Sequence, residues 1–194
     1  MASSAAFAVK AGALCAVGAA VAWLVQRRRR NTQKFLVCFG AQVDVRGVSP
    51  ESQKKFGKLQ FADYIALCKR WCAALGVAVE FFPPVASPAQ CNDIDALCAA
   101  IRAAPSRGCN GILINPGHYT RDAAAAAAIG AALAAAGLPS INTHYSSSPV
   151  ARSCPVIQHT TGVVLGVKEH GMRLGLQALV SMTDTAFMAH DASG

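Results

Sequence analysis

The residues best able to do chemistry lie in polar segments that directly follow strand-like apolar runs. One segment carries Asn115 and Arg121, and another carries His144 and Ser146. An imidazole can pass a proton near neutral pH, and an amide, a guanidinium and a hydroxyl together can bind a small carboxylate or phosphate. Two plainer interpretations stand beside this one. Asn115 would only hydrogen-bond its own turn, and His144 would be a hydrogen-bonded histidine at the end of a strand.

Alternating strands and helices must position these segments. Apolar runs of strand length occur at residues 35–39, 77–82, 111–115 and 139–143. Helical periodicity or composition occurs at residues 59–75, 92–104, 123–136 and 163–182. This order predicts an α/β fold with a parallel sheet and helices on both faces. Ligands bind outside the carboxyl ends of the strands in such sheets, so the expected crevice is formed by residues 40–57, 83–88, 115–122 and 143–152.

The N-terminal segment has the composition of a membrane anchor. Residues 5–25 are apolar or small apart from Lys10, and a helix of about 20 such residues can cross a bilayer. Trp23 and the basic flank Arg27, Arg28, Arg29 and Arg30 follow, as expected at an interface. We therefore predict a transmembrane helix within residues 1–34, an α/β domain at 35–182 and a tail at 183–194. A cleaved targeting peptide is the alternative, although this run is apolar on all sides rather than amphipathic.

Charge and cysteine usage narrow the function classes. The net charge of +8 is concentrated in the first 34 residues, and the remainder is nearly neutral. Nucleic acid is therefore not an expected partner. Charged residues make up only 14% of the chain, below the usual share of about 25%, so we expect a partner to cover part of the domain. The eight cysteines include no CxxC pair. They are predicted to be reduced core thiols, and no metal or cofactor is expected.

The segment GILINPGHYT at residues 111–120 resembles the IINPGAYTH motif of type II 3-dehydroquinate dehydratases. Three weaker similarities occur in the same order along the chain. They are FLVCFG at 35–40, LPSINTHYSS at 138–147, and the paired sequences GVVLG and GMRL at 162–166 and 171–174. The resemblance implies a flavodoxin-like three-layer sandwich, in a family whose members usually form trimers that build dodecamers.

The resemblance also implies roles for individual residues. The family removes water through an enolate and uses a tyrosine base, an arginine that lowers the pKa of that tyrosine, an asparagine-rich enolate site and a histidine acid. Asn115 matches the asparagine of the NPG turn, His144 matches the acid, and Ser146 matches a residue that binds the substrate carboxylate.

Other matched positions depart from the family pattern. Gln42 replaces the loop asparagine, Ser49 the activating arginine, Phe56 the tyrosine base, Arg121 a histidine and Asn142 the glutamate that supports the acid. Losing one such group typically lowers a rate by about 10²–10⁴-fold. On these grounds the sequence predicts a pseudoenzyme without catalytic residues.

The anchor and the changed positions together predict an accessory subunit of a membrane protein complex of the respiratory-chain type. The expected location is the mitochondrial inner membrane with the domain in the matrix, or alternatively the outer membrane facing the cytosol. The expected partners are other subunits of that complex, the lipid bilayer and, as in the family, two further copies in a homotrimer. Two alternatives stay open. One is an enzyme or small-anion binder of altered chemistry, and the other is a dehydroquinase whose base is Tyr64 or Tyr119.

Overall fold

The computed structural model describes residues 33–40, 61–84 and 91–184 of the 194-residue chain. Five parallel strands form one sheet in the order β2-β1-β3-β4-β5. The strands are β1 (Lys34–Phe39), β2 (Ala78–Phe82), β3 (Gly111–Asn115), β4 (Ser140–His144) and β5 (Gly162–Leu165). This is the flavodoxin-like order, and the chain reverses its direction of travel across the sheet after β2. The predicted α/β, flavodoxin-like fold is therefore confirmed.

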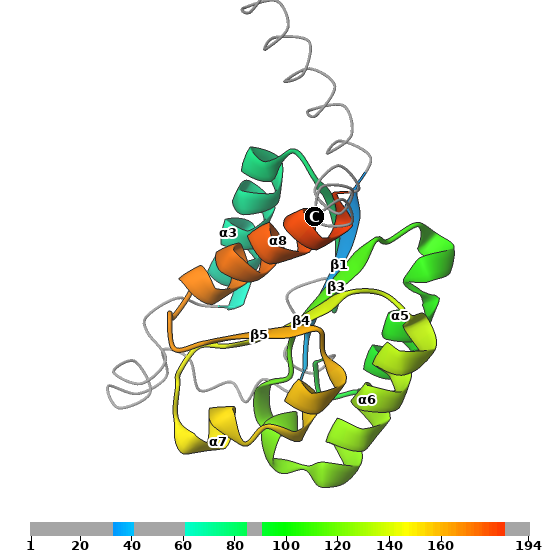
Figure 1. Cartoon of the computed structure of the whole chain (residues 1–194), viewed down its shortest axis with the longest axis vertical. Coiled ribbons are helices and arrows are strands. Elements are labelled where there is room, and N and C mark those ends of the chain that lie inside the picture. The colour runs from blue at the N-terminus through cyan, green and yellow to red at the C-terminus, as the bar shows by residue number, and fades with distance from the viewer. Residues whose placement is uncertain (1–32, 41–60, 85–90, 185–194) are drawn as a thin grey trace, which may run out of the picture.

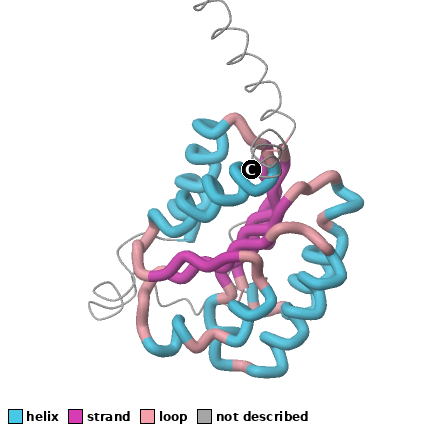
Figure 2. Tube along the Cα trace, in the orientation of Figure 1, coloured by secondary structure: helices cyan, strands magenta, loops and turns pink. Residues whose placement is uncertain are grey.

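Helices cover both faces of the sheet (Figures 1 and 2). The longer helices are α3 (Phe61–Leu75), α5 (Ile94–Ala103), α6 (Ala123–Ala136) and α8 (His170–Thr183). The shorter ones are α7 (Pro149–Arg152) and the 3₁₀ turns η1 (Pro105–Arg107), η2 (Gly117–Arg121) and η3 (Pro155–His159). Helices α5 and α6 pack on one face, and α3 and α8 pack on the other.

Alternation along the strands divides the apolar residues between two cores. In β3, Ile112 and Ile114 face α5 and α6, whereas Leu113 faces α3 and α8. Helix α8 approaches the sheet closely at Gly175, where a Cβ atom would lie 2.5 Å from Leu113 Cδ1. Helix α8 also returns the end of the domain to its beginning. Gln33 Nε2, just before β1, donates a hydrogen bond to Thr183 Oγ1 at the end of α8, at 3.0 Å.

Local signals explain where the helices begin and end. Asp122 caps α6 by accepting a hydrogen bond from Ala125 N at 3.0 Å, and Gly137 ends the helix with a φ of 62°. Asp93 caps α5 in the same way, accepting from Ala96 N at 2.9 Å. The predictions for residues 111–115 and 123–136 are therefore confirmed to the residue. The fourth strand lies one residue later than predicted, which makes His144 its last residue.

The predicted helix at residues 163–182 is wrong in its first part. Residues 162–165 form the fifth strand, which pairs with β4 in the register Asn142↔Val163 and His144↔Leu165. The β-branched pair Val163-Val164 suits a strand. The chain then turns through Gly166 at φ 78° and Lys168 at φ 52°, conformations that no helix contains, before α8 begins.

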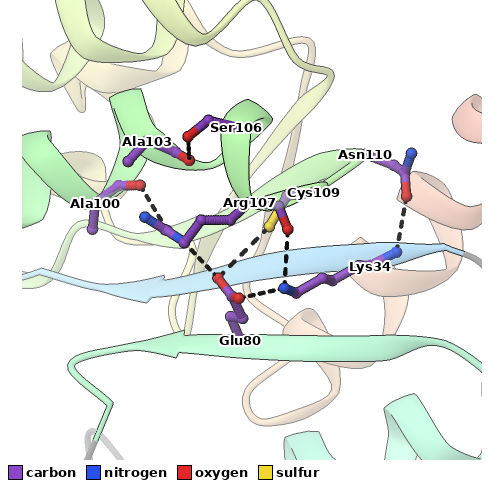
Figure 3. A network of polar contacts seen from close by, with 8 residues as sticks. All are labelled: Lys34, Glu80, Ala100, Ala103, Ser106, Arg107, Cys109 and Asn110. Atoms are coloured by element: carbon purple, nitrogen blue, oxygen red, sulfur yellow. Dashed lines mark hydrogen bonds and ion pairs between the residues drawn. The ribbon is translucent and has the colours of Figure 1, made fainter.

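A charged cluster fastens the edge strand β2 to its neighbours (Figure 3). The Glu80 carboxylate contacts Lys34 Nζ and accepts a hydrogen bond from Arg107 Nε at 2.8 Å. Lys34 Nζ also donates to the Arg107 carbonyl at 3.1 Å. Burial alone would raise the pKa of Glu80, but the hydrogen bonds from Lys34 and Arg107 lower it below the usual value. Glu80 is therefore ionised at neutral pH.

None of the helices within the described ranges is both long and apolar enough to span a bilayer. The predicted transmembrane helix and its flank Arg27–Arg30 lie in residues 1–32, outside the described part of the chain.

Candidate functional site

The candidate site lies where the central strands end. Strand β1 ends at Phe39, which pairs with Asn115 at the end of β3, and β4 ends at His144 beside them. Gly40 follows β1 and donates its N–H to the Asn115 carbonyl at 2.8 Å. A Cβ atom at Gly40 would lie 2.5 Å from the Pro116 carbonyl oxygen. Only glycine lets the chain leave β1 this close to the turn after β3.

Asn115 holds that turn. Its side chain is almost fully buried, and Oδ1 accepts a hydrogen bond from Gly117 N at 3.1 Å. This is the plainer of the two roles expected for Asn115. Because Ile114 pairs with Asn142, Asn115 lies beside Thr143, and its side chain leaves the sheet on the face opposite to His144. The two residues therefore share an edge of the sheet but not a face.

His144 is a buried polar residue at the end of β4, with a ring nitrogen left unpartnered by the described residues. It is 6% exposed, and its Nε2 atom has no hydrogen-bond partner among the described residues. Burial disfavours the charged ring and lowers its pKa to about 4. The imidazole is therefore neutral at pH 7. The plainer interpretation, a fully hydrogen-bonded histidine, does not fit this nitrogen.

Asn142 lies two residues before His144 on the same strand, so the two side chains share a face. Its Nδ2 donates to Cys154 Sγ at 3.9 Å, and its Oδ1 has no partner within the described ranges. Asn142 carries no charge, so it cannot raise the pKa of His144 as a neighbouring carboxylate would.

Ser146 and Arg121 flank the strand end. Ser146 Oγ donates to Ser148 Oγ at 3.3 Å, and Ser148 Oγ in turn accepts from Ala151 N at the start of α7. Arg121 is an exposed residue at the end of η2, the turn against which α7 lies. Arg121 thus ends the turn against which the helix that follows Ser146 packs.

All three tyrosines of the chain lie in the described part, and all are buried. Tyr64 packs edge-on against Phe39, with ring centroids 5.9 Å apart. Tyr119 Oη donates to the Cys91 carbonyl at 3.4 Å, and burial is the main cause that raises its pKa. Both tyrosines that the sequence offered as replacement bases are therefore built into the cores.

Tyr145 is the residue that sequence reasoning missed. It directly follows His144, and its hydroxyl donates to Glu169 Oε2 at 3.3 Å. Glu169 stands just before α8, so the contact joins the end of β4 to the start of that helix. Its place between His144 and Ser146 in the sequence is the signal that could have identified Tyr145.

The matched positions Gln42, Ser49 and Phe56 lie outside the described residues. The seven described cysteines are free and buried, and burial raises the pKa of the thiols, for example to about 11 at Cys91. Among the described residues, no group of three His, Cys, Asp or Glu side chains could hold a metal ion.

Comparison with known proteins identifies the family. A family model described as "Dehydroquinase class II" matches residues 33–180. The 3-dehydroquinate dehydratase 2 of Pseudomonas putida is 32% identical over 73% of this chain and 89% of its own length. The 3-dehydroquinate dehydratase of Alkalilimnicola ehrlichii is also 32% identical, over 66% of this chain and 81% of its own. The chain therefore belongs to the class II dehydroquinase family, as its motifs predicted.

A solved structure supports the fold. The type II dehydroquinase of Butyrivibrio crossotus superimposes with a TM-score of 0.63 over 76% of this chain and 97% of its own, at 22% identity.

The predicted pseudoenzyme is wrong. The relatives are named as dehydratases, which are enzymes, and none of the matches indicates an accessory subunit of a mitochondrial or respiratory-chain membrane complex. The prediction relied on apparent replacements at five single positions, Gln42, Ser49, Phe56, Arg121 and Asn142, and matches at single positions do not establish a loss of catalysis.

Proposed function

We propose that this chain is a dehydratase that eliminates water from 3-dehydroquinate or from a closely similar cyclic hydroxy-ketone carboxylate. The names of the Pseudomonas putida and Alkalilimnicola ehrlichii relatives support the reaction class. The observation that carries the proposal is the buried imidazole of His144, which ends a central strand with Nε2 unpartnered within the described residues. A buried polar atom without a partner is costly unless a ligand satisfies it.

His144 serves as the acid for the departing hydroxyl group. In the unliganded protein its pKa is about 4, so it carries no charge at neutral pH. A bound carboxylate nearby raises that pKa, because an opposite charge favours the imidazolium. The ring then gives its proton to the leaving oxygen as the carbon–oxygen bond breaks, and water departs.

Tyr145 serves as the base in this proposal. Its hydroxyl takes the proton from the carbon next to the substrate carbonyl while passing its own proton to Glu169. The support for this role is the 3.3 Å contact between the hydroxyl and the Glu169 carboxylate, together with the position of Tyr145 beside His144. Tyr64 and Tyr119 are less suited, because the first is in the core and the second donates to a backbone carbonyl.

The substrate carboxylate would be held at the flank of the site. Ser146 and Ser148 offer hydroxyl donors there, and Arg121 offers a guanidinium on the neighbouring turn. A guanidinium can bind a carboxylate through two parallel hydrogen bonds. Arg121 would therefore contribute to binding more than to the elimination step.

A direct assay tests the function. The full-length chain is incubated with 3-dehydroquinate, and the conjugated product is followed by its ultraviolet absorbance. We expect turnover that falls at least about 10²-fold in His144→Gln, whereas the exposed His159→Gln variant keeps the wild-type rate. A folded wild-type chain that leaves 3-dehydroquinate unchanged would refute the proposal.

A homotrimer is part of the proposal. The outward face of α6 consists of alanines alone, so another copy could approach closely: Ala123, Ala124, Ala127, Ala128, Ala131, Ala134 and Ala135. Sedimentation of the full chain would give three times the monomer mass, and a monomeric mass would count against it.

The N-terminal anchor at residues 5–25 and a mitochondrial membrane location are separate proposals. They are supported by the sequence alone. Carbonate extraction of cell membranes tests the anchor: an integral protein stays in the pellet, and release into the supernatant would oppose it.

A further inference from the structure

The Glu169 carboxylate has a different partner on each of its two oxygens. Oε2 accepts the hydrogen bond from the Tyr145 hydroxyl at 3.3 Å, and Oε1 lies 4.0 Å from His170 Nε2. Tyr145 follows β4, whereas His170 is the first residue of α8. Within the described ranges, the Glu169 side chain has no other hydrogen bond or ion pair. One carboxylate therefore joins a hydroxyl to an imidazole.

These three side chains lead from the interior of the domain to its surface. Tyr145 is 9% exposed. The side chains of Glu169 and His170 are 31% and 56% exposed. Tyr145 is thus almost closed to water, whereas the His170 ring meets it directly. The order of exposure is that of a path by which protons can travel between a buried hydroxyl and the solvent.

The backbone of the turn between β5 and α8 holds these groups in place. Lys168 has a φ of 52°, in the left-handed region that residues other than glycine seldom adopt. Its N–H donates to the Tyr145 carbonyl at 3.1 Å, and His170 N donates to the Val167 carbonyl at 3.1 Å. Strained backbone of this kind persists where the surrounding structure imposes it, and it is frequent at functional sites. The turn thereby fixes Glu169 beside the Tyr145 hydroxyl.

The cations near Glu169 in the sequence do not neutralise it. Lys168 precedes it and Arg173 lies one helical turn after it, and both are exposed. Of the ion pairs in the described part of the chain, only the one with His170 includes Glu169. A lysine or arginine partner would hold the carboxylate permanently in its charged form. An imidazole instead takes up and releases protons near neutral pH, so Glu169 can pass a proton to it.

We propose that His170 completes a proton path from Tyr145 through Glu169 to the solvent. This rests on the proposed function, in which Tyr145 is the base. As the tyrosine oxygen takes the substrate proton, its own proton passes to Glu169 Oε2. Rotation of the carboxyl group and of the exposed imidazole closes the 4.0 Å gap, and His170 Nε2 takes the proton.

The protons balance over one cycle. The His170 ring releases one proton to water or buffer. His144, which has given its proton to the departing hydroxyl, takes one up from the solvent. The reaction as a whole then removes one water molecule from the substrate and changes no charge on the protein.

Rescue by a free base tests the path in the full-length chain. With 3-dehydroquinate at low buffer concentration, His170→Ala is expected to lower kcat at least about 10-fold and to leave KM unchanged. Added imidazole should restore kcat, because it replaces the missing ring. The control His159→Ala removes another exposed imidazole, which contacts Gln158 Nε2 at 3.2 Å, and should keep the wild-type kcat. Wild-type kcat in His170→Ala, or a loss that imidazole does not restore, overturns the proposal.

Hydroxyl exchange gives a second readout that needs no turnover. With tyrosines labelled with ¹³C at Cζ, NMR in mixtures of H₂O and D₂O measures how fast each hydroxyl hydrogen exchanges with solvent. In His170→Ala, the Tyr145 hydroxyl should exchange several-fold more slowly than in the wild type. The Tyr119 hydroxyl, which donates to the Cys91 carbonyl, should be unchanged in the same spectra.

The two experiments separate the path from the proposed function. A wild-type chain that leaves 3-dehydroquinate unchanged refutes the dehydratase, and the exchange rates then decide on the path alone. Equal exchange of the Tyr145 hydroxyl in the wild type and in His170→Ala overturns the path, whatever the activity.

Discussion

The Tyr145 hydroxyl donates to the Glu169 carboxylate at 3.3 Å, so the residue that follows β4 contacts the turn that joins β5 to α8. Two backbone hydrogen bonds fasten the same turn to the end of β4: Gly166 N donates to the His144 carbonyl at 3.3 Å, and Lys168 N donates to the Tyr145 carbonyl at 3.1 Å. Tyr145, the proposed base, is therefore oriented by Glu169. This residue directly precedes α8, whereas the sequence predicted it to lie inside a helix.

Removing the Tyr145 hydroxyl is expected to abolish most of the elimination activity. Tyr145→Phe should lower kcat at least about 10²-fold, since phenylalanine cannot transfer a proton. Glu169→Gln should lower it to a similar extent, because an amide cannot take the proton that Tyr145 passes on. The matched control is Tyr119→Phe, whose hydroxyl donates to Cys91 and is expected to matter little for turnover. Steady-state kinetics decide the point, and equal rates in Tyr145→Phe and wild type would remove Tyr145 from the mechanism.

His144 makes stability depend on pH. Its pKa is about 4 in the folded chain and 6.5 in the reference state, so between these values the unfolded chain binds more protons. Stability therefore falls as the pH drops from about 6.5 to about 4, by at most about 3 kcal/mol. His144→Gln cannot titrate and should lack this component. Urea unfolding at a series of pH values measures it, and parallel curves for both proteins would contradict the buried neutral ring.

Gly175 sets the distance between α8 and the sheet. A methyl group there would lie 2.5 Å from Leu113 Cδ1 and 3.1 Å from Thr143 Cγ2, inside the core. Gly175→Ala should therefore destabilise the domain by about 1–3 kcal/mol, although alanine is the better helix former. Ser181→Ala, at an exposed position of the same helix, is the control and should change little. Thermal unfolding compares them, and a Gly175→Ala domain as stable as wild type would mean that α8 packs more loosely.

The Glu80 cluster should contribute a small, salt-sensitive stability. Its side chains are about one-third exposed, so Glu80→Gln is expected to cost only about 0.5–1 kcal/mol at pH 7. Because its folded-state pKa is lowered, the contribution is present above the usual carboxyl pKa and disappears as the pH falls through the lowered value. Denaturant midpoints from pH 7 downward, in low and high salt, measure this. A difference that neither acid nor salt reduces would not be electrostatic.

The sequence predicted the fold best where turn residues mark both ends of an element. Asp122 and Gly137 delimit α6, and Pro116 ends β3, so both were placed to the residue. Strand β5 was missed because its valines continue the apolar spacing of α8, and only the backbone turn at Gly166 and Lys168 separates the two. For short apolar runs, periodicity does not distinguish a strand from part of a helix.

The candidate site was only partly predictable for a related reason. His144 could be selected because it follows an apolar run, and the structure places it as the last residue of β4. The Tyr145–Glu169 contact joins residues from different elements, and it exists only because β5 returns the chain to the end of β4. The place of Glu80 on an edge strand likewise depends on strand order, which no local pattern contains.

The hydrogen bond between Gln33 and Thr183 has a practical consequence. Both ends of the domain leave from the amino end of the sheet, whereas His144 and Tyr145 lie at the carboxyl end. The domain is therefore suited to circular permutation: a short linker could join residue 184 to residue 33, with new termini opened at the exposed Gly137. In the unpermuted domain, a protein fused before residue 33 or after residue 184 would be attached at the end of the sheet opposite to His144.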